Sequence, residues 1–156
     1  MNPWDRSPAF SATCTDIVEI DGRITNQDLA KHCNLSPSAC FDRTRKLRDN
    51  GYISSYVALL DPHLNQRPLL IFIEVLLNRT TGDIFRQFAE ATRRQRDILE
   101  CHMVAGGFDY LIKVRMKDMA AYRKFLAEEL VDMPGVRETR TYAVLEEVKS
   151  TTALPL

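Results

Sequence analysis

The chain has 156 residues, enough for one ordinary domain or two small ones. Its 21 basic residues balance its 21 acidic ones, and 45% hydrophobic with 27% charged residues suits a soluble globular protein. It has no apolar run of 18 residues, and its first residues lack the basic start and apolar core of a secretory signal, so we expect a cytoplasmic protein without a membrane span.

A first helix is predicted only weakly ahead of residue 21. Phe10, Cys14, Ile17 and Val18 can form an apolar stripe on it. Pro8 and several serines and threonines lower its helix propensity. We therefore expect a weakened helix at this position.

Residues 25–51 predict two short helices joined by a tight turn. Thr25 can cap the first helix, because its side chain can accept from a backbone N–H that has no partner within the helix. Ser36 can cap the second, with Pro37 at its first position, where the missing N–H costs nothing. Gly51 suits its end. This arrangement is typical of a helix-turn-helix.

The second of these helices is predicted to have a buried face and a basic outer face. At 100° per residue, Cys40, Thr44 and Leu47 share the inner face. Residues 31–48 carry five lysines and arginines against Asp42 alone, which in a neutral chain indicates contact with phosphate rather than a merely solvated helical hairpin. We expect double-stranded DNA as a partner. The candidate residues are Ser36, Ser38, Ala39 and Arg43 near bases, and Arg45, Lys46 and Arg48 on phosphates.

The chain is predicted to divide at residues 61–68. The run ISSYVALLD before this point is rich in β-formers and suits a small wing or a connecting strand. The segment DPHLNQRP has two prolines with polar residues between them and predicts a linker. We therefore expect a winged-helix-like helix-turn-helix domain at 1–60, a linker at 61–68 and a second domain at 69–156.

The second domain follows the pattern strand-helix-strand twice. Gly106 and Gly107 suit a sharp turn or a close backbone approach between two of its strands. The order of elements is that of a ferredoxin-like βαββαβ plait, so the expected fold class is α+β. The expected strands are 69–77, 98–105, 108–116 and 136–148, and the expected helices are 82–95 and 118–131.

Both helices of such a plait cover one face of the sheet. The strand at 69–77, LLIFIEVLL, is apolar on both of its faces except at Glu74. An apolar face without a helix over it implies association, so we expect at least a homodimer.

The four cysteines have no metal-binding spacing. Cys14, Cys33, Cys40 and Cys101 form no CxxC pair, and the three histidines are scattered. Two of the cysteines fall on predicted buried faces. We expect reduced thiols that pack as small hydrophobic side chains, no metal site and no cofactor.

The ordered set of segments resembles the Lrp/AsnC, or feast/famine, family of transcriptional regulators. The resemblance runs from about Asp21 to Lys149 and is carried by DGRITNQDLAKHCNLSPSAC, GYISSYVALLDP, LECHMVAGGFDYLIKV, DMAAYRKFL, MPGVRETRTY and LEEVK. It implies plait domains that dimerise, dimers that assemble into rings, commonly octamers, and a free amino acid bound between dimers as effector.

The resemblance places the effector loop between the second and third strands of the plait. Glycine N–H groups in this loop can hold an α-carboxylate, and Asp109 can accept from an α-ammonium unless it is only a solvated turn carboxylate. Met103 and Met119 favour an apolar amino acid, although core packing alone would also explain them. The implied effector-binding residues are Met103, Gly106, Gly107, Phe108, Asp109, Tyr110, Met119, Arg140, Thr141 and Tyr142.

The chain departs from the family pattern in two places. The family usually has an acidic residue after the first glycine of the loop, where this chain has Gly107, so one carboxylate beside Asp109 is missing. The first helix, which packs behind the reading helix in the family, is weak here. The first departure bears on which effector binds, or whether one does, and the second on the affinity for DNA.

Three other interpretations remain open. GGFDYLIKV superficially resembles an RNA-recognition strand, but Asp109 and the absence of a basic residue before Gly107 argue against it. Sirohaem decarboxylases share the two-domain architecture, and His102 and Arg140 could contribute to a tetrapyrrole cleft, but the basic reading helix would then be unexplained. The chain could also be an effector-binding subunit without its own DNA binding. We favour a regulator without catalytic residues.

Overall fold

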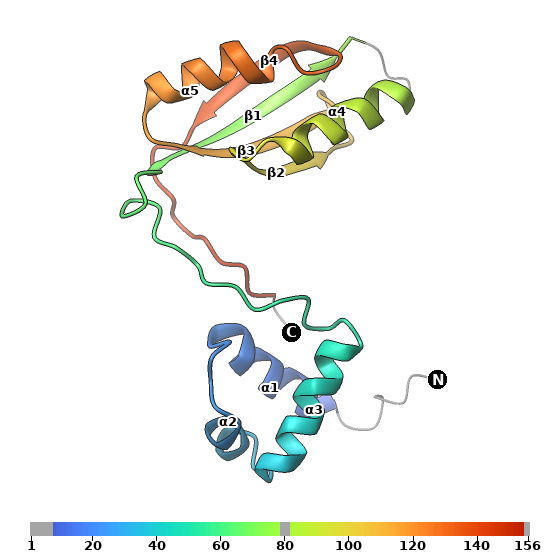
Figure 1. The fold of residues 1–156 in the computed structure, drawn as a ribbon, viewed down its shortest axis with the longest axis vertical. Helices are drawn as coiled ribbons and strands as arrows, with labels where there is room; N and C mark the ends of the chain where they lie inside the picture. Colours follow the sequence, from blue (N-terminus) through green and yellow to red (C-terminus); the bar gives the residue numbers. More distant parts are fainter. Residues whose placement is uncertain (1–7, 79–81, 155–156) are drawn as a thin grey trace. The chain divides into compact units, whose positions relative to one another are not determined.

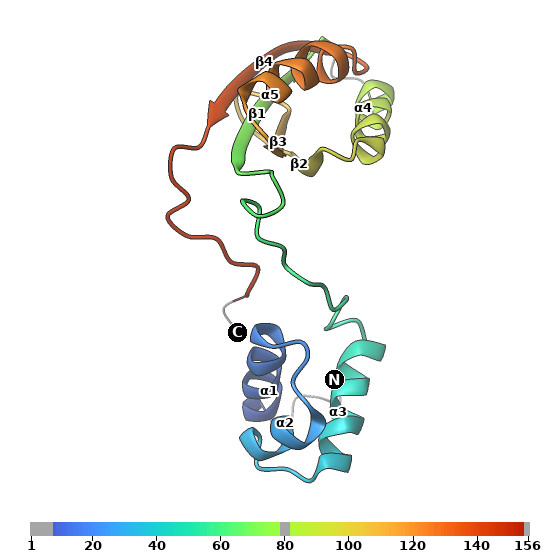
Figure 2. The ribbon, with the colours of Figure 1, turned by 60° about the vertical axis from the view of Figure 1, so that its left-hand side comes forward.

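The computed structural model describes residues 8–78 and 82–154 (Figures 1 and 2). The chain splits into two compact units, Met1–Leu59 with Lys149–Leu156, and Leu60–Val148. Each unit has its own hydrophobic core and is described by itself. Within the described residues, no helix is long and apolar enough to cross a membrane.

The first unit contains three helices, α1 (Pro8–Ile20), α2 (Asn26–His32) and α3 (Pro37–Asp49). The two predicted caps are present, because Thr25 Oγ1 accepts from the Asp28 N–H at 3.1 Å and Ser36 Oγ accepts from the Ala39 N–H at 3.2 Å. The α1 helix forms despite its weak propensity. Among the side chains that the structure describes in this unit, the buried ones are mostly small: Cys14, Val18, Leu29, Ala30 and Cys40.

The wing or connecting strand expected after α3 is absent from the described residues. The segment 54–60 has no strand pairing, and Val57 and Leu59 are exposed on it. A strand needs a hydrogen-bonded partner strand as well as β-forming residues, and this segment pairs with none among the described residues.

The second unit is the expected ferredoxin-like plait. Four antiparallel strands lie in the order β2-β3-β1-β4, and α4 and α5 cover one face of the sheet (Figure 1). The strands are β1 (Leu69–Leu77), β2 (Ile98–Met103), β3 (Tyr110–Met116) and β4 (Val136–Ala143), and the helices are α4 (Gly82–Arg94) and α5 (Met119–Phe125), which continues as a π-helical turn at Leu126–Leu130.

The last strand is five residues shorter than the sequence predicted. β4 ends at Ala143, which pairs with Ile71 of β1. One further hydrogen bond joins the Val144 N–H to the Leu70 carbonyl at 3.0 Å. Since β1 itself begins at Leu69, which falls opposite Leu145 in this register, the residues after Leu145 have no β1 strand beside them.

The face of the sheet away from the helices is amphipathic rather than wholly apolar. Phe72, Leu76 and Leu111 lie half-buried on it. Charged side chains share this face, among them Glu74 of β1 itself and Arg140 of the neighbouring strand β4, whose charged atoms lie 3.9 Å apart. The apolar face expected from the sequence of β1 therefore also carries charged side chains from the adjacent strand.

Candidate DNA-binding helix and effector loop

The helix α3 has the predicted inner and outer faces. Cys40 is fully buried, Thr44 and Leu47 are half-buried, and the Thr44 hydroxyl donates to the Cys40 carbonyl at 3.0 Å. On the outer side Ser36 and Ser38 are exposed, with their hydroxyls 3.2 Å apart. The two serines therefore mark the helix start with polar groups that face solvent.

The basic residues of α3 lie mostly on its exposed surface. Arg45, Lys46 and Arg48 are exposed, while Ala39 and Arg43 are half-buried. Arg45 lies 3.6 Å from Asp42 and Arg48 lies 3.8 Å from Asp49, at exposures where such pairs hold the side chains only weakly. These two guanidinium groups can therefore turn toward phosphate at little cost.

Phe41 is a candidate contact that the sequence reasoning missed. Its ring is 51% exposed, and the Arg45 guanidinium lies over it with 5.9 Å between its central carbon and the ring centroid. It shares the outer face with Ser38 and Arg45, three residues before it and four after it. An exposed aromatic residue between these two positions was the available signal, since an apolar side chain there can contact a thymine methyl group.

Two of the four cysteines are paired, which corrects the expectation of reduced thiols throughout. Cys14 of α1 and Cys33, the C-cap residue that follows α2, form a disulfide with their Cα atoms 6.2 Å apart. Sequence spacing gave no sign of this pair, because it depends on how α1 packs against α2. Cys40 and Cys101 are unpaired thiols.

The effector loop is exposed, and nothing within the protomer requires its glycines. Neither Gly106 nor Gly107 has a positive φ, and a Cβ atom added to either would meet no atom within 4 Å. The chain does turn here, because residues 105–109 are bends between the antiparallel strands β2 and β3, but the expected alternative of a close backbone approach is absent at both glycines. Both residues present open backbone on the surface.

Asp109 is built into the sheet rather than simply solvated. Its Oδ2 atom accepts from the Leu77 N–H at 2.8 Å. Its own N–H donates to the Val75 carbonyl, and its carbonyl accepts from the Val104 N–H, both at 3.0 Å. Two of these hydrogen bonds hold the loop against the end of β1, and the third, from Val104, closes the loop on itself.

The neighbouring aromatic residue, Tyr110, belongs to the core. Its ring lies 4.6 Å from that of Phe88 between centroids, and its hydroxyl donates to the Phe85 carbonyl at 3.3 Å. Burial raises the pKa of the Tyr110 phenol. Tyr110 therefore packs against α4 and anchors the end of the loop in the core. Phe108, two residues before it, is half-buried.

Met103 and Met119 are not core residues. Met103 at the end of β2 is 59% exposed, and Met119 at the start of α5 is 48% exposed. The alternative that core packing explains these two methionines is excluded. Large apolar side chains at such exposure are available to a ligand or to a neighbouring subunit.

The three predicted residues of β4 do not share a face. Thr141 pairs with Ile73 on the helix side, where its hydroxyl contacts that of Tyr122. Arg140 and Tyr142 lie on the other face beside Glu74, and a hydrogen bond to the Glu74 carboxylate raises the pKa of the Tyr142 phenol. A ligand within one protomer cannot contact all three residues from one side of the sheet.

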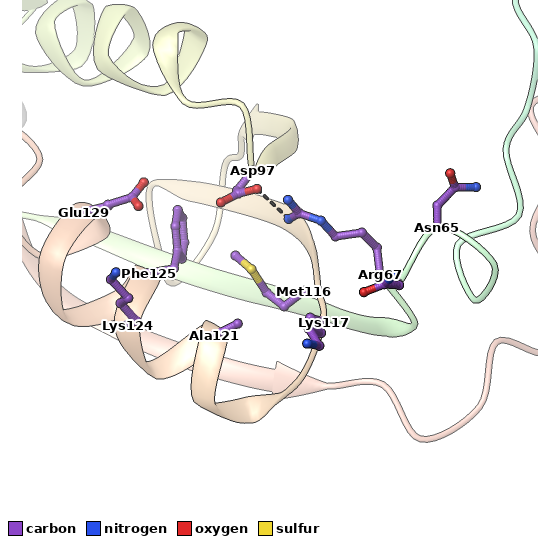
Figure 3. Close-up of a pocket in the computed structure, with 10 residues that line it drawn as sticks. Asn65, Arg67, Asp97, Met116, Lys117, Ala121, Lys124, Phe125 and Glu129 are labelled. Atoms are coloured by element: carbon purple, nitrogen blue, oxygen red, sulfur yellow. Dashed lines mark hydrogen bonds and ion pairs between the residues drawn. The ribbon is translucent and has the colours of Figure 1, made fainter.

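A shallow cavity of about 500 Å³ lies at the opposite end of β3 from the effector loop (Figure 3). An ion pair between Arg67 and Asp97, with 2.5 Å between the charged atoms, crosses its edge. None of the predicted effector residues lines this cavity. Its lining residues are Asn65, Gln66, Arg67, Asp97, Met116, Lys117, Ala121, Lys124, Phe125 and Glu129. Among the described residues no cluster of His, Cys, Asp or Glu could hold a metal ion.

Both halves of the chain match models of known families. Residues 17–54 match the winged helix-turn-helix DNA-binding model, and residues 70–154 match the Lrp/AsnC ligand binding domain. The leucine-responsive regulatory proteins of Escherichia coli K12 and Serratia marcescens are each 51% identical to this chain over 137 residues, which is 88% of this chain and 84% of theirs.

Solved structures agree with this relationship. A transcriptional regulator of Neisseria meningitidis, solved as a complex with L-Met, superposes with a TM-score of 0.91 at 33% identity, over 94% of this chain and 95% of that one. An AsnC family regulator of Agrobacterium tumefaciens superposes with a TM-score of 0.90 at 27% identity, over the same shares. This chain therefore belongs to the Lrp/AsnC family of DNA-binding transcriptional regulators.

Proposed function

We propose that this regulator responds to an apolar amino acid, such as leucine or methionine, bound at the effector loop. The observation that carries the proposal is the open backbone at Gly106 and Gly107. Neither a positive φ nor a close neighbour within the protomer requires glycine at these two positions. Glycine N–H groups suit an α-carboxylate. Two exposed methionines, Met103 and Met119, supply adaptable apolar surface for the side chain of a ligand.

The α-ammonium group is assigned to Asp109. One of its carboxylate oxygens already accepts from the Leu77 N–H, which fixes the orientation of the group. A carboxylate oriented in this way retains acceptor capacity at its second oxygen. Phe108 and Tyr110 flank it, and Arg140, Thr141 and Tyr142 complete the proposed effector set from β4.

The relatives support the choice of ligand class. The Neisseria protein was solved with L-Met, and the 51% identical relatives are named for their response to leucine. Because flexible methionines accept several shapes, we expect modest selectivity among apolar amino acids.

The assembly is proposed as a homodimer that associates further, to an octamer. The face of the sheet carrying Phe72, Leu76 and Leu111 provides apolar area for the interface. The charged side chains around it would fix how the two protomers align. Since no side of one protomer brings Arg140 and Thr141 together, a cleft between dimers would assemble the effector set from different chains.

The DNA-reading role is proposed for α3. Ser36 caps this helix, and Ser38, Ala39 and Arg43 lie between its start and its middle, where a reading helix contacts bases. Arg45, Lys46 and Arg48 follow as proposed phosphate contacts. We propose domains at 1–60 and 69–156 joined by 61–68, in a cytoplasmic protein. Family membership favours this function over a decarboxylase or a subunit without DNA binding.

Calorimetry with the full-length protein tests the proposal directly. Leucine and methionine should bind with heats that glutamate does not produce, and replacing Met103 by Ser should weaken both. Phe41→Ala, in the other unit, is the matched control and should leave both affinities unchanged. If no apolar amino acid binds at millimolar concentration, the proposal is wrong, and the carboxylate missing at Gly107 accounts for the loss of effector binding.

A further inference from the structure

The paired cysteines link the first two helices of the small helical unit. Cys14 is buried on α1, and Cys33, the C-cap residue of α2, is half-buried. Their Cα atoms are 6.2 Å apart, within the range of about 4.4–6.8 Å that a disulfide spans without moving the backbone. The bond joins two helices that are otherwise held only by packing.

Among the side chains that the structure describes in this core, the buried ones are Cys14, Val18, Leu29, Ala30 and Cys40, and Ile17, Ile24 and Ile53 pack partly buried against them. A unit of about 60 residues can bury only a limited share of its surface and therefore gains much from a covalent link, because the link removes conformations from the unfolded chain. The bond between Cys14 and Cys33 closes a loop with a sequence separation of 19 residues.

The link also lies next to the reading helix. Cys33 precedes Asn34, whose φ of 53° makes the turn, and Ser36 then caps α3. The Leu35 N–H donates to the Ala30 carbonyl at 2.9 Å, so the turn is anchored on α2. Fixing Cys33 to α1 therefore fixes the residue from which the turn into α3 begins.

We propose that Cys14 and Cys33 form a reversible dithiol–disulfide switch that stabilises the DNA-binding unit when hydroperoxides are present. A regulator in the cytoplasm works among reduced thiols, where a disulfide is usually transient and redox-sensing. The proposal goes beyond the effector response, because it concerns residues of the other unit.

The chemistry needs only a hydroperoxide and the two thiols. The Cys33 thiolate, the more exposed of the two, attacks one peroxide oxygen, the O–O bond breaks, and Cys33 becomes a sulfenic acid while one water leaves. The Cys14 thiolate then attacks the Cys33 sulfur and displaces a second water. Overall, two thiols and one hydrogen peroxide give one disulfide and two waters. A dithiol reductant reverses the bond by exchange and is itself oxidised.

The remaining cysteines differ from the pair in ways that make them controls. Cys101 lies in the plait unit, where burial raises the pKa of its thiol and so disfavours the reactive thiolate. Cys40 is a free thiol in the same small core but has no exposed surface. Neither is expected to replace Cys33 as the thiol that meets the oxidant.

The test uses the full-length protein, first fully reduced and then treated with hydrogen peroxide. Thiols are counted after denaturation, and the cross-linked peptides are identified by mass. Wild type and Cys101→Ser should each lose two thiols, recover them with dithiothreitol, and yield the peptide pair containing Cys14 and Cys33. Cys14→Ser and Cys33→Ser should not form this pair.

The oxidised wild type should also be more stable and bind DNA better when warm. A link that closes a loop of this length raises the unfolding midpoint of a small domain by roughly 10 °C or more. DNA affinity near the midpoint of the reduced protein should rise with it, and reduction should abolish both gains. Retention of all four thiols, a cross-link through Cys40 or Cys101 or between chains, or a Cys14–Cys33 bond that changes neither midpoint nor DNA affinity would overturn the proposal.

Discussion

The carboxylate of Asp109 accepts a hydrogen bond at 2.8 Å from the backbone N–H of Leu77, a residue 32 positions earlier in the chain. The bond ties the effector loop to the end of β1. The carboxylate therefore carries two properties that can be separated by mutation. One is its acceptor atom, which the sheet uses, and the other is its negative charge, which we assign to the effector.

Replacing Asp109 by Asn should separate these two properties. The amide keeps an acceptor for the Leu77 N–H, so stability should change little, while loss of the charge should weaken amino-acid binding at least about tenfold. Asp109→Ala should lose the effector too, and should also destabilise the plait by about 1–3 kcal/mol because the Leu77 N–H loses its partner. Calorimetry and urea unfolding of both variants measure the two effects. Equal effector affinity in wild type and Asp109→Asn would place the ammonium group elsewhere.

Two basic residues of α3 should differ in what they contribute to DNA binding. Lys46→Ala should weaken all sequences alike and reduce the salt slope by about one unit, as expected for a phosphate contact. Arg43→Ala should relax sequence preference and cost about 1–3 kcal/mol on the cognate site if it reads guanine. Binding titrations at several salt concentrations, on cognate and scrambled duplexes, distinguish these results. The assignment fails if neither variant changes affinity or preference.

Phe41 extends this test to a residue that is apolar. Phe41→Ala should lower affinity without altering the salt slope, because no charge is removed, while the Arg45 guanidinium loses the ring beneath it. The same duplexes and salt series measure the effect. Asp42→Asn, a neighbouring change on α3, is the matched control and should raise affinity slightly by removing a negative charge beside phosphate. A changed slope in Phe41→Ala would indicate that Arg45 had moved with it.

Gly135 is a glycine that the plait requires. Its φ is +77°, and an added Cβ would lie 2.5 Å from Cγ2 of Ile84 on α4. Gly135→Ala should therefore destabilise the plait by about 2–4 kcal/mol through backbone strain and overpacking. Gly107→Ala is the control, because nothing lies within 4 Å there, and it should leave the unfolding midpoint unchanged. A loss of stability in both variants would show that the loop has a neighbour outside the protomer.

Many helices and strands of both units were predictable because their patterns are local. The continuous apolar run of β1 and the caps of α2 and α3 lie within single segments, and both are present. The pairing of Cys14 with Cys33 and the bond from Asp109 to Leu77 join distant segments, so no spacing could reveal them. The positions of Arg140 and Thr141 on opposite faces follow from strand alternation, a signal that was present but not used.

The proposed assembly can be tested on the plait unit alone. A fragment covering residues 60–148, which keeps its own core, should form a stable oligomer whose mass light scattering can measure. Phe72→Lys places a charge in the middle of the proposed interface and should shift this fragment toward monomer. Lys117→Glu, on the exposed turn after β3, changes charge away from that face and should leave the mass unchanged. A monomeric wild-type fragment would contradict the role assigned to this face.

The acid stability of the plait should depend on Glu100 of β2. The Lys113 ammonium, 2.8 Å away, and then the His102 ring lower the pKa of this carboxyl below its ordinary value. A carboxyl whose pKa is lower in the folded state favours folding fully above its ordinary pKa, and this contribution disappears as the pH falls through the lowered value. Glu100→Gln should therefore reduce the urea midpoint at neutral pH slightly and leave it unchanged near pH 2. Glu90→Gln on the exposed side of α4 is the control, and an equal effect of both changes at neutral pH would show that the ion pair with Lys113 contributes nothing specific.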